Sequence, residues 1–584
     1  MSAATGTPNA PGPHRGDSAP ARISWPTAGW ARTRALLPGR AELATLRRDP
    51  RRDLIAGLTV AVVALPLALA FGITSGLGAG AGLVTAVIAG VVAATFGGSN
   101  LQVSGPTGAM TVVLVPIVAQ FGGSAVLVVG LLAGVLLLGL AYSGAGRYMR
   151  YIPVPVVEGF TIGIALVIAL QQVPAALGVH GAGEKVVLVA ADAVRAWFTD
   201  PHWADPMIAA AVALSMLLAA RFRPSWPVSL PAVVVVAAIT SLAHLQVPVI
   251  GTLPTVLAAP SLPHLPLGQL TSLVLPAVAV AALGALESLL SATVADGMSV
   301  GERHDPDKEL VGQGLANLVV PFFGGIPATA AIARTAVNVR SGARSRLAAI
   351  VHSLALLVVV LAFAPVVGTI PLAALAGVLI ATTVQMVEVS SVRALLRSTR
   401  GDAVVLVLTA AATLIFDLVT AVVLGLVVAG FFALQQVARS AHVDELDIEP
   451  EVGAHDAEEA ALLADHIVAY RLEGSLFFGA AHSFLLGLSE VSDVRVVVLR
   501  LSRVSTLDAT GASVLADTIA RLEGRGITVL LSGVRPDHEQ VLTRLGVFDS
   551  LAHERHVFAS TPDAIAHARA HARRVAHDPS DPVS

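Results

Sequence analysis

Two charged side chains, Glu287 and Arg334, lie inside long apolar stretches, where each could bind an ion. Arg334 follows the sequence GGIP at 324–327. Gly-Gly-x-Pro cannot continue a helix but can open one, because the first helical turn has no use for the N–H that proline lacks. We therefore expect a helix from about Thr329 onward, whose free N–H groups and positive dipole end attract an anion. Arg334 would add positive charge about one turn inside it.

A second break of the same kind, QVSGPTG at 102–108, precedes another short apolar segment. Thr107 supplies a hydroxyl beside the free N–H groups of that segment. Two half-helices with facing N-termini form a compact positive pocket that needs no metal ion. The alternative interpretation is a proline-kinked helix without a ligand.

Glu287 stands near the middle of an apolar segment at 270–297, and a buried acid there is a functional hypothesis by default. Ser291, four residues later, lies on the same helix face. Glu287 could form a neutralising pair with Arg334, which would be purely structural, or it could bind a proton or a cation. The residues alone leave these alternatives open.

The composition places these residues in a membrane. The chain of 584 residues is 55% hydrophobic and 13% charged, about half the charged fraction of soluble domains. Its formal charge of -3 argues against nucleic-acid binding, and the absence of cysteine excludes disulfides and thiolate chemistry. No nucleophile–base pair or metal cluster stands out, so we do not expect an enzyme or a cofactor, apart from a coupled H⁺ or Na⁺.

The sequence predicts an α-helical membrane protein of 14 segments within a transport domain at 51–440. The expected segments are 54–74, 79–97, 107–121, 124–143, 156–177, 207–221, 227–245, 270–297, 308–323, 329–340, 345–366, 371–389, 402–416 and 418–437. Two of them, 107–121 and 329–340, are shorter than the ~20 residues of a full span. They are the third and the tenth, the matching positions of a seven-plus-seven inverted repeat.

The N-terminal region, 1–50, is predicted to be a disordered basic tail. Its arginines continue to the start of the first apolar segment, which places the N-terminus in the cytoplasm by the positive-inside rule. An even number of spans returns the chain to the same side. The basic run consists of Arg32, Arg34, Arg40, Arg47, Arg48, Arg51 and Arg52.

The C-terminal part reads as a soluble α/β domain at 466–562, after an acidic linker at 441–465. Strands are expected at 467–472, 494–501 and 527–532, and helices at 479–490, 510–524 and 536–546. No phosphate-binding glycine loop is present. Residues 563–584 are predicted to be a disordered or solvated helical tail, in which His567 and His571 have metal-ligand spacing without further support.

Four motifs resemble the sulfate permease (SulP) family of anion transporters. They are LPLALAF at 65–71, QVSGPTGAM at 102–110, the stretch 285–317 that begins ALESLLSATVADG, and GGIPATAAIARTAVNVRSGARSR at 324–346. The resemblance extends over about 50–560. It implies two inverted repeats arranged as a core and a gate domain, and a homodimer in the cell membrane.

The resemblance also implies site residues. Substrate contacts are expected at Leu67, Phe71, Thr107, Thr329, Ala333 and Arg334, and cation coupling at Glu287 and Ser291. Ala333 replaces the serine of the family's Ser-Arg pair, and Leu67 replaces a glutamine of animal members, so the pocket is expected to be less polar. A glutamate rather than an aspartate at 287 favours proton over sodium coupling.

Residues 466–560 resemble the STAS domain of sulfate transporters and anti-sigma-factor antagonists. In the antagonists a phosphorylated serine begins a helix, and Thr510 takes that place in the turn at 507–511. Thr510 is thus a candidate regulatory phosphosite.

The expected function is secondary active transport of a small anion by alternating access. Sulfate is the first candidate substrate, with bicarbonate or a dicarboxylate as alternatives. An anion channel, or a membrane signalling platform based on the STAS domain, are the competing interpretations.

Overall fold

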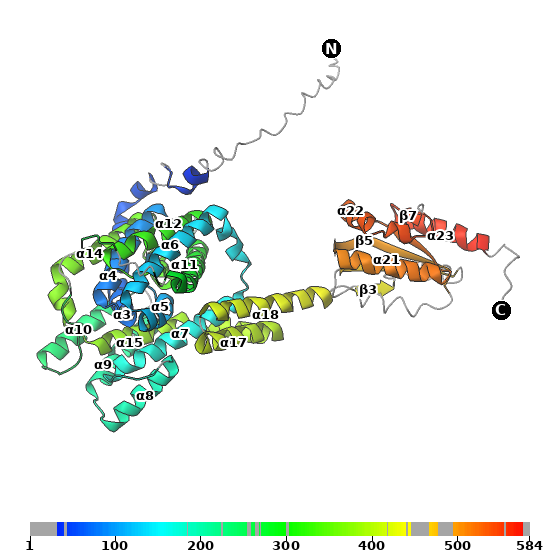
Figure 1. The fold of residues 1–584 in the computed structure, drawn as a ribbon. Coiled ribbons are helices and arrows are strands. Elements are labelled where there is room, and N and C mark those ends of the chain that lie inside the picture. The colour runs from blue at the N-terminus through cyan, green and yellow to red at the C-terminus, as the bar shows by residue number, and fades with distance from the viewer. Residues whose placement is uncertain are drawn as a thin grey trace, which may run out of the picture. The chain divides into compact units, whose positions relative to one another are not determined.

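The computed structural model describes most of the chain as two compact units, Met1–Leu426 and Val427–Ser584 (Figure 1). The described residues are 32–39, 44–183, 185–223, 226–253, 259–262, 268, 270–299, 303–416, 418–439, 442–445, 466–476, 494–553 and 556–575. The predicted N-terminal tail up to residue 31, most of the linker and the helix expected at 479–490 lie outside them.

Each of the 14 predicted apolar segments contains a helix in the structure. In the first block these helices are α3 (Pro50–Thr74), α4 (Ala79–Phe96), α5 (Gly108–Phe121), α6 (Gly123–Ser143), α7 (Val154–Leu177), α9 (Ala204–Phe222) and α10 (Ser229–Leu242). In the second block they are α11 (Leu270–Met298), α12 (Pro306–Val319), α13 (Ile332–Arg340), α14 (Leu347–Gly368), α15 (Leu372–Met386), α17 (Arg400–Ile415) and α18 (Leu418–Arg439).

Shorter elements connect these helices. They are η1 (Thr45–Arg47), β1 (Ser104–Gly105), η2 (Ala145–Tyr151), α8 (Val186–Thr199), η4 (Val320–Phe323), β2 (Thr329–Ala330) and α16 (Val389–Ser398). Eight helical stretches among the described residues are long and apolar enough to cross a membrane. A count of 14 crossings stays a prediction.

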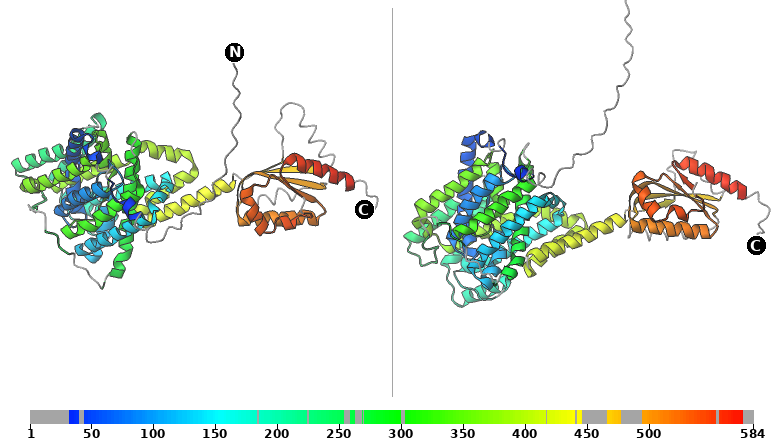
Figure 2. Two further views of the ribbon diagram at one scale, coloured as in Figure 1. Left: turned by 90° about the horizontal axis from the view of Figure 1, so that it is seen from above. Right: turned by 45° about the horizontal axis from the view of Figure 1, so that its top comes forward.

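The helix contacts repeat between the two blocks. α3 packs on α14 as α11 packs on α6, and α4 packs on α14 as α12 packs on α6. Further along the blocks, α9 packs on α15 as α17 packs on α7. When every helix is replaced by its counterpart in the other block, the first contact of each comparison turns into the second. The contacts therefore have the two-fold relation of a repeat. Figure 2 shows these helices interleaved in two further views.

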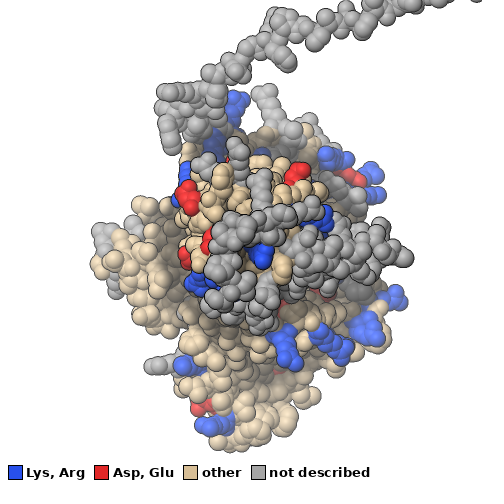
Figure 3. Space-filling view, turned by 90° about the vertical axis from the view of Figure 1, so that its right-hand side faces the viewer, with Lys and Arg blue, Asp and Glu red and all other residues tan. Residues whose placement is uncertain are grey.

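The contacts also separate two groups of helices. One group, α3 to α6 with α11 to α14, forms the core, and the other, α7, α9, α10, α15 and α17, forms the gate. The groups meet where α3 touches α10 and α15 and where α5 touches α7. On the face drawn in Figure 3, uncharged residues cover most of the described surface.

Small residues let α3 and α4 pack backbone to backbone. A Cβ atom on Gly82 of α4 would lie 2.0 Å from the carbonyl oxygen of Ala68 and 2.9 Å from the backbone of Gly72. No side chain can move aside to make room, since the obstacles are backbone atoms. Glycine is therefore required where α4 packs on α3.

We expect Gly82→Ala to destabilise the membrane unit by at least about 2 kcal/mol, because the two helices must separate to admit one methyl group. Thermal unfolding of the purified full chain checks this. Gly139→Ala is the matched control, because a Cβ atom there meets nothing within 4 Å. Equal unfolding temperatures for the two variants would contradict the close packing.

The second unit contains a five-stranded sheet in the order β3-β4-β5-β6-β7. Its strands are β3 (His442–Glu445), β4 (Ile467–Leu476), β5 (Val496–Leu507), β6 (Thr528–Ser532) and β7 (Val557–Phe558). The pairs from β4 to β7 are parallel, and β3 is antiparallel to β4. The three predicted strands are present, although β5 is longer than expected.

Helices cover both faces of this sheet. α21 (Ala509–Gly524) and α22 (Pro536–Arg544), followed by the short η5 (Phe548–Ser550), pack on one face through Leu515, Ile519 and Leu542. α23 (Thr561–Val575) packs on the other. The sequence predicted α21 and α22 to within two residues.

Two boundaries of the second unit were predicted wrongly. Residues 442–445, assigned to the linker, form the edge strand β3. Residues 563–575, assigned to a disordered tail, belong to α23, whose Ala564, Ala568 and Ala572 are buried against the sheet. Alanines spaced by four form only a narrow apolar stripe on a helix. The composition of such a segment is therefore easily taken for that of a disordered tail.

Four histidine rings gather beside α23. The ring of His556 is buried, and its centroid lies 5.6 Å from that of His567, 6.2 Å from that of His571 and 5.8 Å from that of His553. No group of three such side chains among the described residues is arranged to hold a metal ion. Burial, and then the charges of the neighbouring rings, lowers the pKa of His556.

The lowered pKa of His556 makes the second unit sensitive to acid. The unfolded chain binds the proton more readily than the folded chain, so stability falls as pH drops below the unfolded pKa of about 6.5 and is unaffected above it. We expect the free energy of unfolding to decrease progressively between pH 7 and pH 5. Thermal unfolding of the full chain across this range should show a flatter pH dependence for His556→Gln; an unaltered profile would exclude His556 as the cause.

Candidate anion site

The two glycine–proline breaks meet in space. β1 and β2 pair in antiparallel register, with Ser104 opposite Ala330 and Gly105 opposite Thr329. β1 leads into α5 and β2 leads into α13, so both helix N-termini lie at this crossing. Because the strands are antiparallel, the helices leave the crossing in opposite directions. The predicted facing half-helices are thus present.

The second half-helix starts later than expected. α13 begins at Ile332 with Ala331 as its N-cap, whereas the sequence predicted a helix from about Thr329. Thr329 and Ala330 are used for the pairing with β1, and this long-range contact was not visible in the local pattern.

Thr107 links the first half-helix to the buried acid. It is the N-cap of α5, where its Oγ1 accepts a hydrogen bond from the backbone N–H of Met110 at 3.4 Å. The same hydroxyl donates to Oε2 of Glu287 at 2.9 Å. A carboxylate from α11 therefore stands at the positive end of α5, where a negative charge is stabilised.

Arg334 does not form an ion pair with Glu287. Its guanidinium is 1% exposed, and Nη2 donates to the carbonyl oxygen of Pro106 at 2.8 Å. Nη1 has no partner and lies 2.5 Å from the position that a Cβ atom on Gly105 would take. No ion pair joins these two described side chains, so a neutralising contact pair, one of the open alternatives, is not formed.

Arg334 thus packs against β1 and binds the backbone of the Gly105–Pro106 break. Its charge can act on an anion at the crossing through space, since it is buried where screening by water is weak. The sequence predicted the charge near the crossing but could not predict which carbonyl group it would hold.

Ser291 points to α13 and is fully buried. Its hydroxyl donates to Oγ1 of Thr335 at 3.0 Å, and the same Oγ1 accepts the backbone N–H of Val103 at 3.1 Å. Thr335 therefore joins α11, α13 and the segment before β1. Thr335 was not predicted from the sequence, although a hydroxyl directly after Arg334 was a usable signal.

The remaining predicted contacts occupy different places. The hydroxyl of Thr329 donates to the carbonyl of Gly284 at 3.2 Å. Phe71 is buried, with Cε1 3.1 Å from the position of a Cβ atom on Gly108, and Leu67 is buried in the same core. Ala333 is exposed on α13. The crossing thus gathers Thr107, Thr329 and Glu287 with Phe71 alongside, while Arg334 and Ser291 lie behind it.

A cavity of about 900 Å³ lies between core and gate helices. It is lined by the ends of α3, α5, α7, α8 and α15, including Ala70, Thr74, Val112, Gln171 and Leu375. Ala70 directly precedes Phe71, so the cavity extends along α3 to within one residue of the site. No predicted site residue lines the cavity itself.

The fold and this crossing define a helical membrane protein with two related blocks, paired half-helices and a soluble α/β domain. The chain belongs to the sulfate permease family, whose model matches residues 51–409, and a STAS domain matches 461–564.

Relatives cover nearly the whole chain. It is similar to the putative sulfate transporter YvdB of Bacillus subtilis, with 34% identity over 87% of this chain and 96% of that protein. The bicarbonate transporter BicA of Picosynechococcus is 29% identical over 86% of this chain and 92% of that protein.

Solved structures share the fold. The transmembrane domain of a cyanobacterial BicA matches with a TM-score of 0.59 and 31% identity, covering 65% of this chain and 98% of that chain. The overall structure of SLC26A9 matches with a TM-score of 0.77 at 18% identity, covering 97% of this chain and 99% of that chain, which shows the fold alone.

Proposed function

We propose that this protein is a secondary active transporter of small anions. The observation that carries the proposal is the β1–β2 crossing, where the N-termini of α5 and α13 meet beside the Thr107–Glu287 hydrogen bond. Two helix N-termini and the buried charge of Arg334 create a positive potential without a metal ion. A carboxylate from α11 adjoins that potential and supplies a group that can bind a coupling cation.

Sulfate is the proposed first substrate, and bicarbonate or a dicarboxylate are the alternatives. The relatives named above are described as a putative sulfate transporter and a bicarbonate transporter. Backbone N–H groups bind oxyanion oxygens of any of these. Since Leu67 is apolar and Ala333 has no hydroxyl, backbone groups and Arg334 carry most of the recognition.

The proposed mechanism is alternating access, with Glu287 carrying a proton or a sodium ion. The core would move against the gate where α3 meets α10 and α15 and where α5 meets α7. Occupation of Glu287 by a cation removes a negative charge from the crossing. Anion binding and cation binding therefore favour one another, which is the requirement for symport.

The proposed orientation has the N-terminus and the STAS domain in the cytoplasm of a cell-membrane homodimer. Arginines are concentrated in alternate connections, as the positive-inside rule requires. They are Arg147 after α6, Arg221 at the end of α9 and Arg223 after it, Arg344 and Arg346 after α13, and Arg393 and Arg397 in α16, while Arg195 of α8, between α7 and α9, is an exception. The connection between α14 and α15 contains none.

Uptake into proteoliposomes tests the function. Labelled sulfate, bicarbonate and fumarate are offered with and without imposed proton and sodium gradients. Saturable uptake that one gradient accelerates supports a coupled transporter. Uncoupled, high-conductance currents in a planar bilayer would identify a channel instead.

Thr510 gives some support to a regulatory role of the STAS domain. It is exposed in the first turn of α21, two residues after Asp508, whose side chain accepts the N–H of Gly511 at 2.7 Å. A phosphate there would lie at a helix N-terminus, where its charge is favourable. Loss of partner binding in Thr510→Asp, with no uptake by the wild type, would favour the signalling platform.

A further inference from the structure

We propose that a polar stripe on α12, formed by Glu309, Gln313 and Asn317, positions both breaks of the anion site. The three residues are four apart and therefore share one helix face. They are 2%, 0% and 1% exposed. The inference rests on the proposed function, because it assigns the geometry of the same site to residues that do not touch the substrate.

Asn317 holds the chain just before β2. Its Nδ2 donates to the carbonyl oxygen of Ala328 at 2.8 Å, and its Oδ1 accepts the N–H of Ala328 at 2.8 Å. Both backbone groups of one residue are thus bound by one amide. The hydroxyl of Thr85 in α4 likewise binds both backbone groups of Ile326, at 2.7 Å from its nitrogen and 3.0 Å from its carbonyl oxygen.

Gln313 holds β1. Its Nε2 donates to Oγ of Ser104 at 2.7 Å and to Oε1 of Glu309 at 2.8 Å, which uses both hydrogens of the amide. Ser104 is the first residue of β1 and lies opposite Ala330 of β2. One helix face therefore reaches both strands of the crossing.

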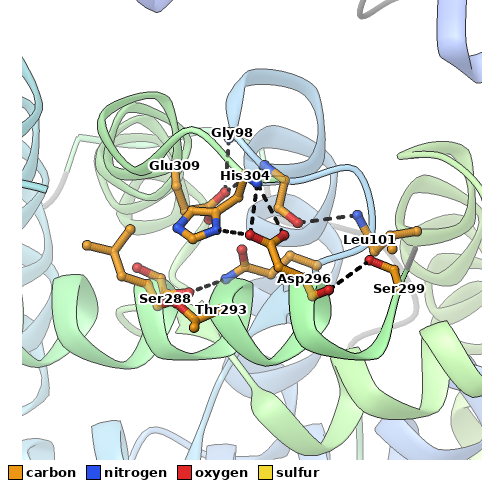
Figure 4. A network of polar contacts seen from close by, with 11 residues as sticks. Gly98, Leu101, Ser288, Thr293, Asp296, Ser299, His304 and Glu309 are labelled. Atoms are coloured by element: carbon orange, nitrogen blue, oxygen red, sulfur yellow. Dashed lines mark hydrogen bonds and ion pairs between the residues drawn. The ribbon is translucent and has the colours of Figure 1, made fainter. Parts of the chain in front are cut away.

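Glu309 holds the segment that leads into β1. Its Oε2 accepts the backbone N–H groups of Gly98 at 3.0 Å and Ser99 at 3.3 Å. Figure 4 shows Glu309 beside Gly98, with the His304 ring and Asp296 next to it, 2.7 Å apart between Nδ1 and Oδ2. The stripe therefore ties the crossing to the polar end of α11 and α12.

Packing alone does not require these polar groups. α12 packs on α4 and α6, helices whose residues are almost entirely apolar, and an apolar face would bury as well without two buried amides and one buried acid. What the polar groups add is a fixed position for the backbone at 98–99, for the Ser104 side chain of β1 and for the backbone of Ala328. Binding by helix N-termini depends on distance, so a shift of the order of 1 Å at β1 weakens it.

A double-mutant cycle between Gln313→Met and Ser104→Ala tests the inference. Methionine has the length of glutamine but donates no hydrogen bond. We expect Gln313→Met to raise the half-saturation concentration for the transported anion about tenfold, with the maximal rate much less affected. Because both changes break the same bond, the double variant should be no worse than Gln313→Met alone.

Backbone hydrogen exchange of the full chain provides a readout that needs no substrate. Amides in 98–105 and 326–332 should exchange faster in Gln313→Met than in the wild type. If Gln313→Met does not fold, Ser104→Ala provides the test instead. It is a smaller change and should also accelerate amide exchange in 98–105. Thr293→Val is the matched control, because it removes only a bond within α11, from Oγ1 to the carbonyl of Leu289 at 2.8 Å, and should leave both measurements unchanged.

A half-saturation concentration raised in the double variant by the product of the two single effects would overturn the inference, as would exchange rates equal to those of Thr293→Val. A wild type that takes up no anion would sink the proposed function. The exchange measurement would still decide whether the stripe holds the crossing.

Discussion

Arg334→Ala is expected to raise the half-saturation concentration for the transported anion by tenfold or more, corresponding to about 1.4 kcal/mol. The change removes a buried positive charge near the crossing and leaves the carbonyl of Pro106 without its 2.8 Å donor. The effect should exceed that in relatives with a serine at the position of Ala333, because position 333 supplies no hydroxyl here. Uptake measured over a range of anion concentrations checks this result.

Arg340→Ala is the matched control for this prediction. Arg340 ends the same helix and is exposed, so its removal should change the half-saturation concentration little. Arg334→Lys should be intermediate, since it keeps the charge and loses the planar donor geometry. An affinity unchanged in Arg334→Ala would contradict the placement of the anion at the crossing.

Glu287→Gln is expected to abolish the acceleration of uptake by an imposed proton or sodium gradient. Glutamine keeps the shape and an oxygen that can accept from Thr107, but it cannot bind a proton or supply a negative charge. Exchange of labelled for unlabelled anion across the membrane, which needs no gradient, should continue. Proteoliposomes with an inward gradient of either cation distinguish the two modes.

Glu158→Gln is the control for a general effect of removing an acid from the membrane unit. Glu158 lies in the first turns of α7 and accepts from the hydroxyl of Ser391 at 2.9 Å, away from the crossing. Its variant should respond to the gradient like the wild type. If Glu287→Gln also keeps its gradient dependence, the coupling group must be sought elsewhere.

The local pattern of the sequence predicted the parts of this site. Glycine and proline mark helix breaks wherever they occur, so GPT at 105–107 and GGIP at 324–327 were recognisable without a structure. The length of the apolar runs located the helices, and their order showed that the two breaks hold matching positions. The cost of a charge in an apolar run singled out Glu287 and Arg334. Runs of aliphatic residues likewise located β5 and β6, and a strand signal at 467–472 located β4.

Contacts between distant segments decided how these parts are used. Strand pairing delayed the start of α13 to Ile332, and Thr107 rather than Arg334 became the partner of Glu287. Arg334 turned to Pro106, and Ser291 turned to Thr335. Each choice is a competition among several partners within hydrogen-bond reach, and only the packing of helices far apart in the chain determines which of them lies at 3 Å. The polar stripe on α12 depends on the same condition: its spacing of four is visible in the sequence, but the three segments that it binds, at 98–99, 104 and 328, are brought to it only by the fold.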